Sequence, residues 1–263
     1  MSAAVASLRI GVQLCQEHTS VDALRAAWRA ADALGVDSIW VWDHFFPLTG
    51  DRAGAHFEAW TLLAAMALDT GRARIGVLVS GNAYRNPDLL ADMARTVDHL
   101  SGGRVILGLG AGWSWRDHRE YGFPLGDRAA RARSLEASLV RIRARLAALS
   151  PGPRGDLPIL VGGGGEKVTL RLAAEHADIW NVSATPERFA AKNRVLDEWC
   201  GRVGRDPATV ERSVLFPCAA LAAVPRYVMA GARHLMVDLR HPFDLGPVAD
   251  LVAGLRSIGL RPD

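Results

Sequence analysis

The feature of this 263-residue chain that most constrains its fold is a repeated alternation of short apolar runs and longer amphipathic stretches. The runs are apolar at almost every position, which is typical of strands buried on both faces. We expect strands at 8–14, 37–43, 73–80, 104–109, 158–161, 178–182, 210–217 and 234–239. We expect helices after them at 21–34, 57–69, 87–100, 127–149, 166–176, 186–203, 225–231 and 247–258. Eight such units predict an α/β protein, a single (β/α)8 TIM barrel over residues 1–263; a doubly wound open sheet is the alternative.

Charge, hydropathy and cysteine content argue against several other classes of protein. The formal net charge is +3 and arginines are interspersed with acids, so we expect no nucleic-acid partner. No apolar run approaches the ~20 residues of a membrane span, and the start of the chain does not read as a secretion signal. Cys15, Cys200 and Cys218 form no CxxC pair, and the eight histidines show no HxH or HxxxH spacing. We therefore expect a cytoplasmic protein with no membrane partner, no disulfide framework and no metal site.

Polar residues at the predicted strand ends are the candidates for chemistry, because a barrel of this kind places its active site there. Asp43 and His44 end the second strand, in "WVWDHF". A carboxylate beside an imidazole can tune the histidine for proton transfer near neutral pH; a polar pair that caps a loop is the alternative. Glu17 and Tyr84, after the first and third strands, are the other candidate proton donors or acceptors. A solvated loop carboxylate is an equally good interpretation of Glu17.

Two glycine-rich loops follow the fourth and fifth predicted strands, which are neighbours in a barrel. One is "GLGAGW" at 108–113, and the other is the four-glycine run at 162–165, before a helix predicted to open near Glu166. Backbone N–H groups in such loops can approach an anion closely, and a helix dipole favours it. The pair predicts a floor for a large phosphate-bearing cofactor; a tight turn without a ligand is the alternative. The GxGxxG dinucleotide fingerprint is absent.

Three segments carry a family resemblance: "GVDSIWVWDHF", "GVLVSGNAYRNPDLLADMARTVDHLSGGRVILGLGAGW" and "PILVGGGGEKVTLRLAAEHADIWNV". Together they resemble the bacterial luciferase-like superfamily, and most of all its actinobacterial branch that uses coenzyme F420, a deazaflavin. The resemblance implies a TIM barrel with the tricyclic ring in its mouth and a non-prolyl cis peptide in the third strand, at Leu78–Val79. It implies that the cofactor is bound by Asp43, His44, Leu78, Val79, Ser80, Asn82, Gly110, Ala111, Gly112, Trp113, Val161, Gly162, Gly163, Gly164 and Gly165.

The chain also departs from this family in three places. Trp113 stands where the sugar-phosphate dehydrogenases of the family carry an acidic residue, which argues against such a substrate. Only "SPGPRGD" at 150–156 replaces the usual insertion after the fourth helix, and the seventh unit, 218–234, is shortened. Both losses predict a wide barrel mouth and a bulky organic substrate, such as a natural-product intermediate or a modified peptide.

The resemblance implies an oxidoreductase in which reduced F420 gives hydride to an electrophilic C=C or C=N bond. His44 is the first candidate for the accompanying proton transfer, before Glu17 and Tyr84. An FMN-dependent monooxygenase is one alternative, because the two cofactors share a phosphate position; a degenerate, non-catalytic ligand-binding barrel is another. Family barrels pair through the helices beside the second and third strands, and the helix at 57–69 is apolar. We therefore expect a homodimer.

Overall fold

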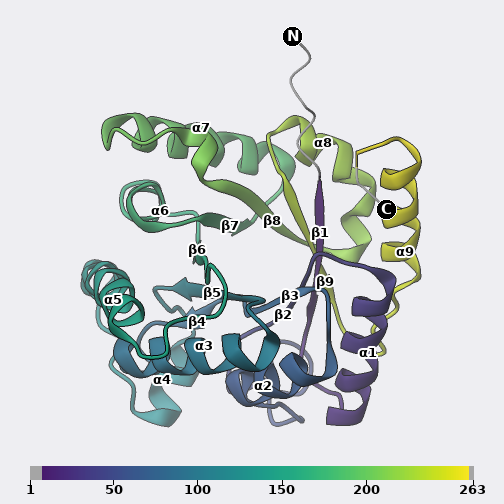
Figure 1. Ribbon diagram of the computed structural model, residues 1–263, viewed down its shortest axis with the longest axis horizontal. Coiled ribbons are helices and arrows are strands. Elements are labelled where there is room, and N and C mark those ends of the chain that lie inside the picture. The colour runs from purple at the N-terminus through teal and green to yellow at the C-terminus, as the bar shows by residue number, and fades with distance from the viewer. Residues whose placement is uncertain (1–7, 261–263) are drawn as a thin grey trace.

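In the computed structural model, which describes residues 8–260, the strands form a closed parallel barrel (Figure 1). The first strand pairs with the second on one side and with the last on the other, so the sheet closes between the two ends of the described chain. The strands are β1 (Arg9–Leu14), β2 (Ser38–Val41), β3 (Arg74–Val77), β4 (Ser80–Gly81), β5 (Val105–Gly110), β6 (Ile159–Gly162), β7 (Ile179–Ser183), β8 (Glu211–Pro217) and β9 (His234–Leu239). Because β3 and β4 both pair with β5, they share one barrel position, and the predicted eight-stranded barrel is confirmed.

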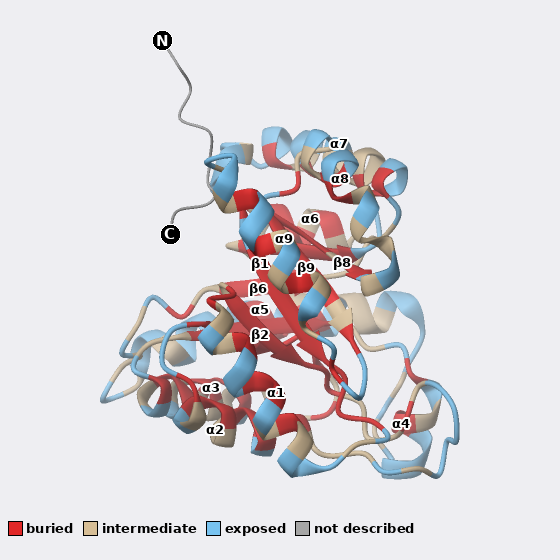
Figure 2. Cartoon of the chain, turned by 90° about the vertical axis from the view of Figure 1, so that its right-hand side faces the viewer, coloured by how far each residue is buried: buried red, intermediate tan, exposed pale blue. Residues whose placement is uncertain are grey.

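Helices surround this barrel and turn one buried side towards it (Figure 2). The ends of the first helix carry typical capping residues: Ser20 accepts a hydrogen bond from Ala23 N, and Gly35 ends the helix in the left-handed region. The α-helices are α1 (Val21–Leu34), α2 (Ala59–Asp69), α3 (Pro87–Ser101), α4 (Trp115–Tyr121), α5 (Arg128–Ala148), α6 (Thr169–His176), α7 (Pro186–Arg202), α8 (Val224–Met229) and α9 (Gly246–Ser257). Two 3-10 helices, η1 (Pro207–Thr209) and η2 (Cys218–Ala223), complete the connections. None of the helices in this described part of the chain could span a membrane.

Three connections between strands can be compared with the elements predicted from the sequence. The sequence analysis missed α4, which lies apart from the surrounding ring of helices (Figure 2). The helix after the glycine run begins at Thr169 rather than near Glu166, because residues 166–168 form a turn. The seventh unit is short as predicted, with η2 and α8 spanning only six residues each.

The core has two layers. The larger lies between the barrel and its helices and includes fully buried Trp28, Trp180 and Phe189. The smaller fills the barrel interior with side chains such as Trp40, Leu78, Ile106 and Met236. The interior is therefore a packed core and not a channel, which leaves the ends of the strands as the place for a site.

The amino ends of three strands carry a buried polar network. Ser38 begins β2, Glu211 begins β8 and His234 begins β9. The carboxylate of Glu211 accepts a hydrogen bond from His234 Nδ1 at 2.8 Å, and His234 Nε2 lies 2.7 Å from Ser38 Oγ. Trp40 Nε1 donates to the same hydroxyl, and Arg9 of β1 pairs with Glu211. The network lies at the amino ends of the strands, where polar side chains of a TIM barrel contribute stability.

The apolar residues of α2 mostly face inwards. Trp60, Leu63 and Met66 are buried against the barrel, whereas Leu68 is 70% exposed. The apolar composition of this helix is therefore largely explained within one chain. The homodimer stays a prediction.

Candidate functional site

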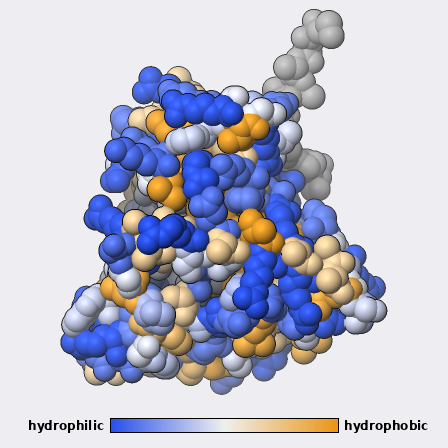
Figure 3. Space-filling view, turned by 90° about the vertical axis from the view of Figure 1, so that its left-hand side faces the viewer, coloured by the Kyte–Doolittle hydropathy of each residue, from blue (hydrophilic) through white to orange (hydrophobic). Residues whose placement is uncertain are grey.

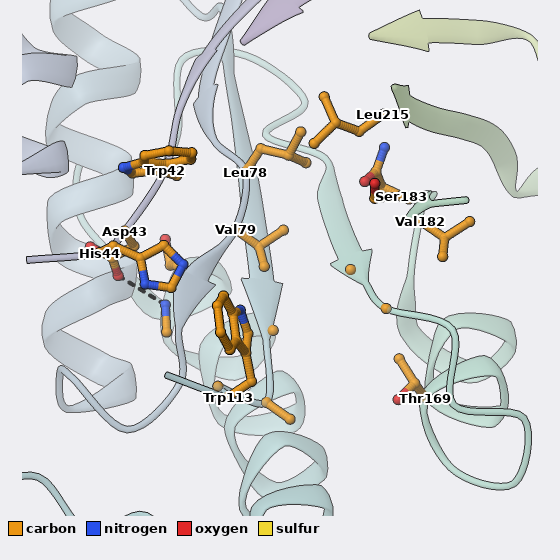
Figure 4. Close-up of a pocket in the computed structure, with 18 of the residues that line it drawn as sticks. Trp42, Asp43, His44, Leu78, Val79, Trp113, Thr169, Val182, Ser183 and Leu215 are labelled. Carbon is orange, nitrogen blue, oxygen red and sulfur yellow. Dashed lines mark hydrogen bonds between the residues drawn. The ribbon is translucent and has the colours of Figure 1, made fainter. Parts of the chain in front are cut away.

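A cavity of about 370 Å³ opens at the carboxyl ends of the strands. In Figure 4, Trp42, Asp43 and His44 lie on one side of it, Leu78 and Val79 in the middle, and Thr169, Val182 and Ser183 on the other. The side chains come from loops after strands far apart in sequence, which only barrel closure brings together. The cavity is therefore the candidate active site.

The middle of the cavity is built by a break in the third barrel strand. The Leu78–Val79 peptide bond is cis, as the resemblance implied, and Gln13 Nε2 donates a hydrogen bond to Leu78 O at 3.0 Å. A Cβ added to Gly110 would lie 2.5 Å from Val79 Cγ2, and one added to Gly162 would lie 2.8 Å from Val79 Cγ1. These two glycines are thus required by the packing of Val79, which the sequence analysis did not foresee.

His44 is paired with a carboxylate that the sequence analysis missed. Its Nδ1 lies 2.7 Å from Asp117 Oδ2, where α4 places that side chain. A carboxylate accepts, so Nδ1 carries the hydrogen and Nε2 is left for other partners. The imidazole ring of His44 lines the cavity, and its centroid lies 5.1 Å from the centroid of the Trp113 ring. The expectation that Asp43 tunes His44 is wrong, because adjacent side chains on this strand end face different neighbours.

Asp117 is a buried acceptor for several donors. Besides His44, Tyr84 donates its hydroxyl to Oδ2 at 3.2 Å, and Phe45 N donates to Oδ1 at 3.3 Å. Burial raises the pKa of Asp117, but the hydrogen bonds from His44, Ser114 and Phe45 outweigh it and hold that pKa below its usual value. Burial and the negative charge of Asp117 raise the pKa of Tyr84, so this phenol keeps its proton near neutral pH. Tyr84 lines the cavity next to the dyad.

Asp43 anchors a different network at the cavity wall. It accepts two hydrogen bonds from Arg85, at 2.6 and 3.0 Å, and one from Gly81 N at 2.8 Å. Arg85 also pairs with Glu58, the cap of α2. This bidentate geometry fixes the loop after β4 against the loop after β2.

Glu17 lies outside the lining of the cavity. Its carboxylate accepts hydrogen bonds from Leu48 N at 2.6 Å and from the Thr49 hydroxyl at 2.6 Å, and it pairs with Arg240. Burial raises its pKa, and these bonds lower it further than burial raises it. The structure gives Glu17 the role of holding the 48–49 loop.

The other residues assigned to the cofactor divide between cavity and surroundings. Those that line the cavity, besides the ones above, are Ser80, Gly110, Ala111, Gly112, Trp113, Gly162 and Gly163. Val161 is fully buried in the core, and Asn82 bonds to Ser134 and Gly110. Gly164 and Gly165 line a neighbouring hollow. The N–H of Gly163 is engaged by Asn181 O at 2.8 Å.

Several lining residues were not singled out from the sequence. They are Thr169, Asn181, Val182, Ser183 and Leu215. Asn181 and Ser183 lie at the end of the strand predicted at 178–182, but nothing in their local pattern separates them from ordinary loop residues. Within residues 8–260, no group of three or more His, Cys, Asp or Glu side chains is placed to hold a metal ion.

Comparison with known proteins identifies the family. The model of the family described as luciferase-like monooxygenase matches residues 3–237, which is most of the chain. This protein therefore belongs to the luciferase-like monooxygenase family, and the resemblance seen in the sequence is confirmed.

Three similar proteins illustrate the range of the family. A 5,10-methylenetetrahydromethanopterin reductase of Methanolobus tindarius is 24% identical, over 85% of this chain and 72% of that protein. A phthiodiolone/phenolphthiodiolone dimycocerosates ketoreductase of Mycobacterium sp. (strain JLS) is 30% identical, over 81% of this chain and 63% of that protein. The solved structure of an F420-dependent secondary alcohol dehydrogenase, in complex with an F420-acetone adduct, superposes with a TM-score of 0.86 at 17% identity, over 95% of this chain and 99% of that one. This structural likeness shows the shared fold.

Proposed function

We propose that this protein is a coenzyme F420-dependent oxidoreductase. The observation that carries the proposal is the His44–Asp117 pair, which opens into the cavity beside the Val79 bulge. The names of the relatives support it, since two are reductases and the structural neighbour is an F420-dependent dehydrogenase. When bound, the deazaflavin supplies or accepts the hydride.

The cavity fits a planar ring system. Val79 and Leu78 give an apolar back wall, and Trp42 and Trp113 give aromatic side walls. The polar groups are few and lie at the edges, as in most cofactor sites. Beyond Gly163, the amides of Gly164 and Gly165 donate to no acceptor within the described residues. These amides and the Thr169 hydroxyl are the groups that would donate hydrogen bonds to the cofactor phosphate.

His44 holds or moves the proton that must accompany hydride transfer. Asp117 keeps the hydrogen on Nδ1, so Nε2 is a base when the ring is neutral and an acid when it is protonated. Tyr84 stays protonated and donates to Asp117, which helps to fix the carboxylate. Asp117 is thus a positioning residue for His44.

The substrate has an electrophilic C=C or C=N bond, and the relatives named ketoreductase and secondary alcohol dehydrogenase add C=O as a third acceptor. A second hollow of about 300 Å³ adjoins the cavity through Trp113 and is walled by Phe46 and Trp115. Such an annex suits the remote part of a bulky molecule, a natural-product intermediate or modified peptide, whose binding energy can be used at the reacting centre.

Titration of the purified protein with oxidised F420 and with FMN, followed by fluorescence, tests the proposal. We expect F420 to bind and FMN to bind at least tenfold more weakly. FMN binding that is equal or tighter would favour a flavin monooxygenase, the activity in the family description. No binding of either cofactor would favour a non-catalytic barrel.

A further inference from the structure

A cationic hollow of about 670 Å³ lies next to the candidate active site. It is walled by α5, by the glycine run and the turn before α6, and by α7. Four cations line it, Arg128, Arg131, Lys167 and Lys192, and Glu166 is the acidic residue of the lining. Figure 3 shows the side of the molecule that carries α5, α6 and the end of α7, where hydrophilic side chains predominate.

Three of these four cations have no ion-pair partner within residues 8–260. Lys192 is the paired one, with Nζ 2.7 Å from Glu166 Oε1. Arg128, Arg131 and Lys167 make no ion pair, and Arg131 donates a hydrogen bond to the backbone oxygen of Gly126 at 2.8 Å. Further along α5, by contrast, Arg141 and Arg145 pair with aspartates of α3. The hollow thus concentrates positive charge that the protein itself leaves uncompensated.

The hollow continues directly from the cavity. Ala111, Gly112 and Thr169 line both. The glycine run crosses from one to the other, with Gly163 in the cavity and Gly164 in the hollow. If the ring of a ligand lies in the cavity and its phosphate lies at Thr169, the groups beyond the phosphate therefore extend into the hollow between α5 and α7.

We propose that Arg128, Arg131, Lys167 and Lys192 bind the oligo-γ-glutamate tail of coenzyme F420. The proposal rests on the proposed function, because it takes F420 as the cofactor. In that coenzyme the phosphate is followed by a lactyl group and a chain of γ-linked glutamates, each with a free carboxylate. This repeated anionic arm matches the cations better than a single phosphate does, because they are distributed over α5, the turn before α6 and α7, and carboxylates spaced along a chain can reach each of them.

Binding of four deazaflavin forms provides the test: the riboside, the phospholactyl form with no glutamate, and forms with two and five glutamates. Affinity is measured by fluorescence or calorimetry at low and high salt. We expect affinity to rise with tail length and the gain to fall with salt. Exposed ion pairs are individually weak, so Arg128→Gln and Arg131→Gln should each weaken the five-glutamate form about 2- to 5-fold, and the double variant about 10-fold. Arg133→Gln is the matched control, an exposed arginine of α5 outside the lining.

Three results would overturn the inference. Affinity independent of tail length would exclude a tail site while leaving F420 as the cofactor. Equal losses for the phospholactyl and five-glutamate forms in the double variant would assign these arginines to the phosphate. Failure of the riboside and of every longer form to bind would refute the proposed function and this inference with it.

Discussion

Replacing Asp117 by asparagine should invert the tautomer of His44. The carboxylate is ionised, since its pKa lies below the usual value, and it accepts from His44 Nδ1 at 2.7 Å. The amide that replaces it offers one acceptor and one donor. Phe45 N can only donate and needs an acceptor at the Oδ1 position, so the amide oxygen takes that position. The amide NH2 then takes the Oδ2 position, where the Tyr84 hydroxyl can accept from it and where it favours a hydrogen on His44 Nε2.

The size of the effect follows from the bond that is lost. A hydrogen bond to a charged group contributes about 1.5–3 kcal/mol, and about 1.36 kcal/mol corresponds to one factor of ten. The population of the competent tautomer, and with it kcat, should fall about 10- to 150-fold. This lies within the 10²–10⁴-fold range of proton-transfer catalysis or just below it. KM should change little, because Asp117 lies behind His44.

The tautomer can be read without knowing the substrate. Long-range ¹H–¹⁵N NMR spectra distinguish a protonated from an unprotonated ring nitrogen, and His44→Gln identifies the signals. We expect protonated Nδ1 in the wild type and protonated Nε2 in Asp117→Asn. Turnover of reduced F420 with a panel of ketones, imines and enones, measured across pH, then gives the kinetic effect.

Glu17→Gln provides the matched control. Glu17 is equally buried and also accepts several hydrogen bonds, but it lies outside the cavity lining. This variant should lose stability and keep its kcat and pH profile. If Asp117→Asn retains both the His44 tautomer and kcat while only its melting temperature falls, the positioning role is wrong.

Three other predictions follow from the structure. Burial lowers the pKa of His56 to about 4, against about 6.5 when unfolded. Between about pH 6.5 and pH 4, the folded state therefore binds fewer protons than the unfolded state. The contribution of neutral His56 to the free energy of unfolding is complete above pH 6.5 and is lost as the pH falls towards 4. After a discount for its partial exposure, we expect about 1–2 kcal/mol more loss than in His56→Gln between pH 7 and 4.5, by urea unfolding. Truncating the substrate should lower kcat as well as raise KM, and an undiminished kcat on a molecule the size of cyclohexenone would argue against the annex. We also propose a homodimer that buries exposed Leu68, Leu89 and Leu100 of α2 and α3; sedimentation of a monomer at micromolar concentration would contradict it, and Leu68→Glu should weaken the dimer.

The alternation of strands and helices predicted the barrel, with a doubly wound open sheet as the alternative. Continuous apolar runs such as 104–109 indicate strands that are buried on both faces. The structure places β5 there, at Val105–Gly110, with every residue buried. The cis bond at Leu78–Val79 could not come from periodicity and was predicted only through the family resemblance. α4 was missed because "WRDHREY" is a short polar segment whose helix ends depend on Gly122 and on contacts with distant loops.

The site was predicted in part. Barrel topology placed His44 and Tyr84 at the right rim of the sheet, and both line the cavity. Topology does not say which way a side chain turns: Asp43, expected to tune His44, bonds to Arg85 instead, and Glu17 bonds to Thr49 outside the cavity lining. Asp117 lies 73 residues from His44 in a segment read as loop, and no local pattern connects the two.

The polar network at the amino ends of the strands has a consequence for how the chain is made. β1 cannot complete its pairing until β9 has been synthesised, more than two hundred residues later. Until then, β1 and β8 are open strand edges, which invite pairing with other chains. When β9 arrives, His234 must lie level with both Ser38 and Glu211. A slip of one residue would turn the imidazole away and leave a largely buried carboxylate without its partner. The network therefore favours the correct register of β9 when the barrel closes.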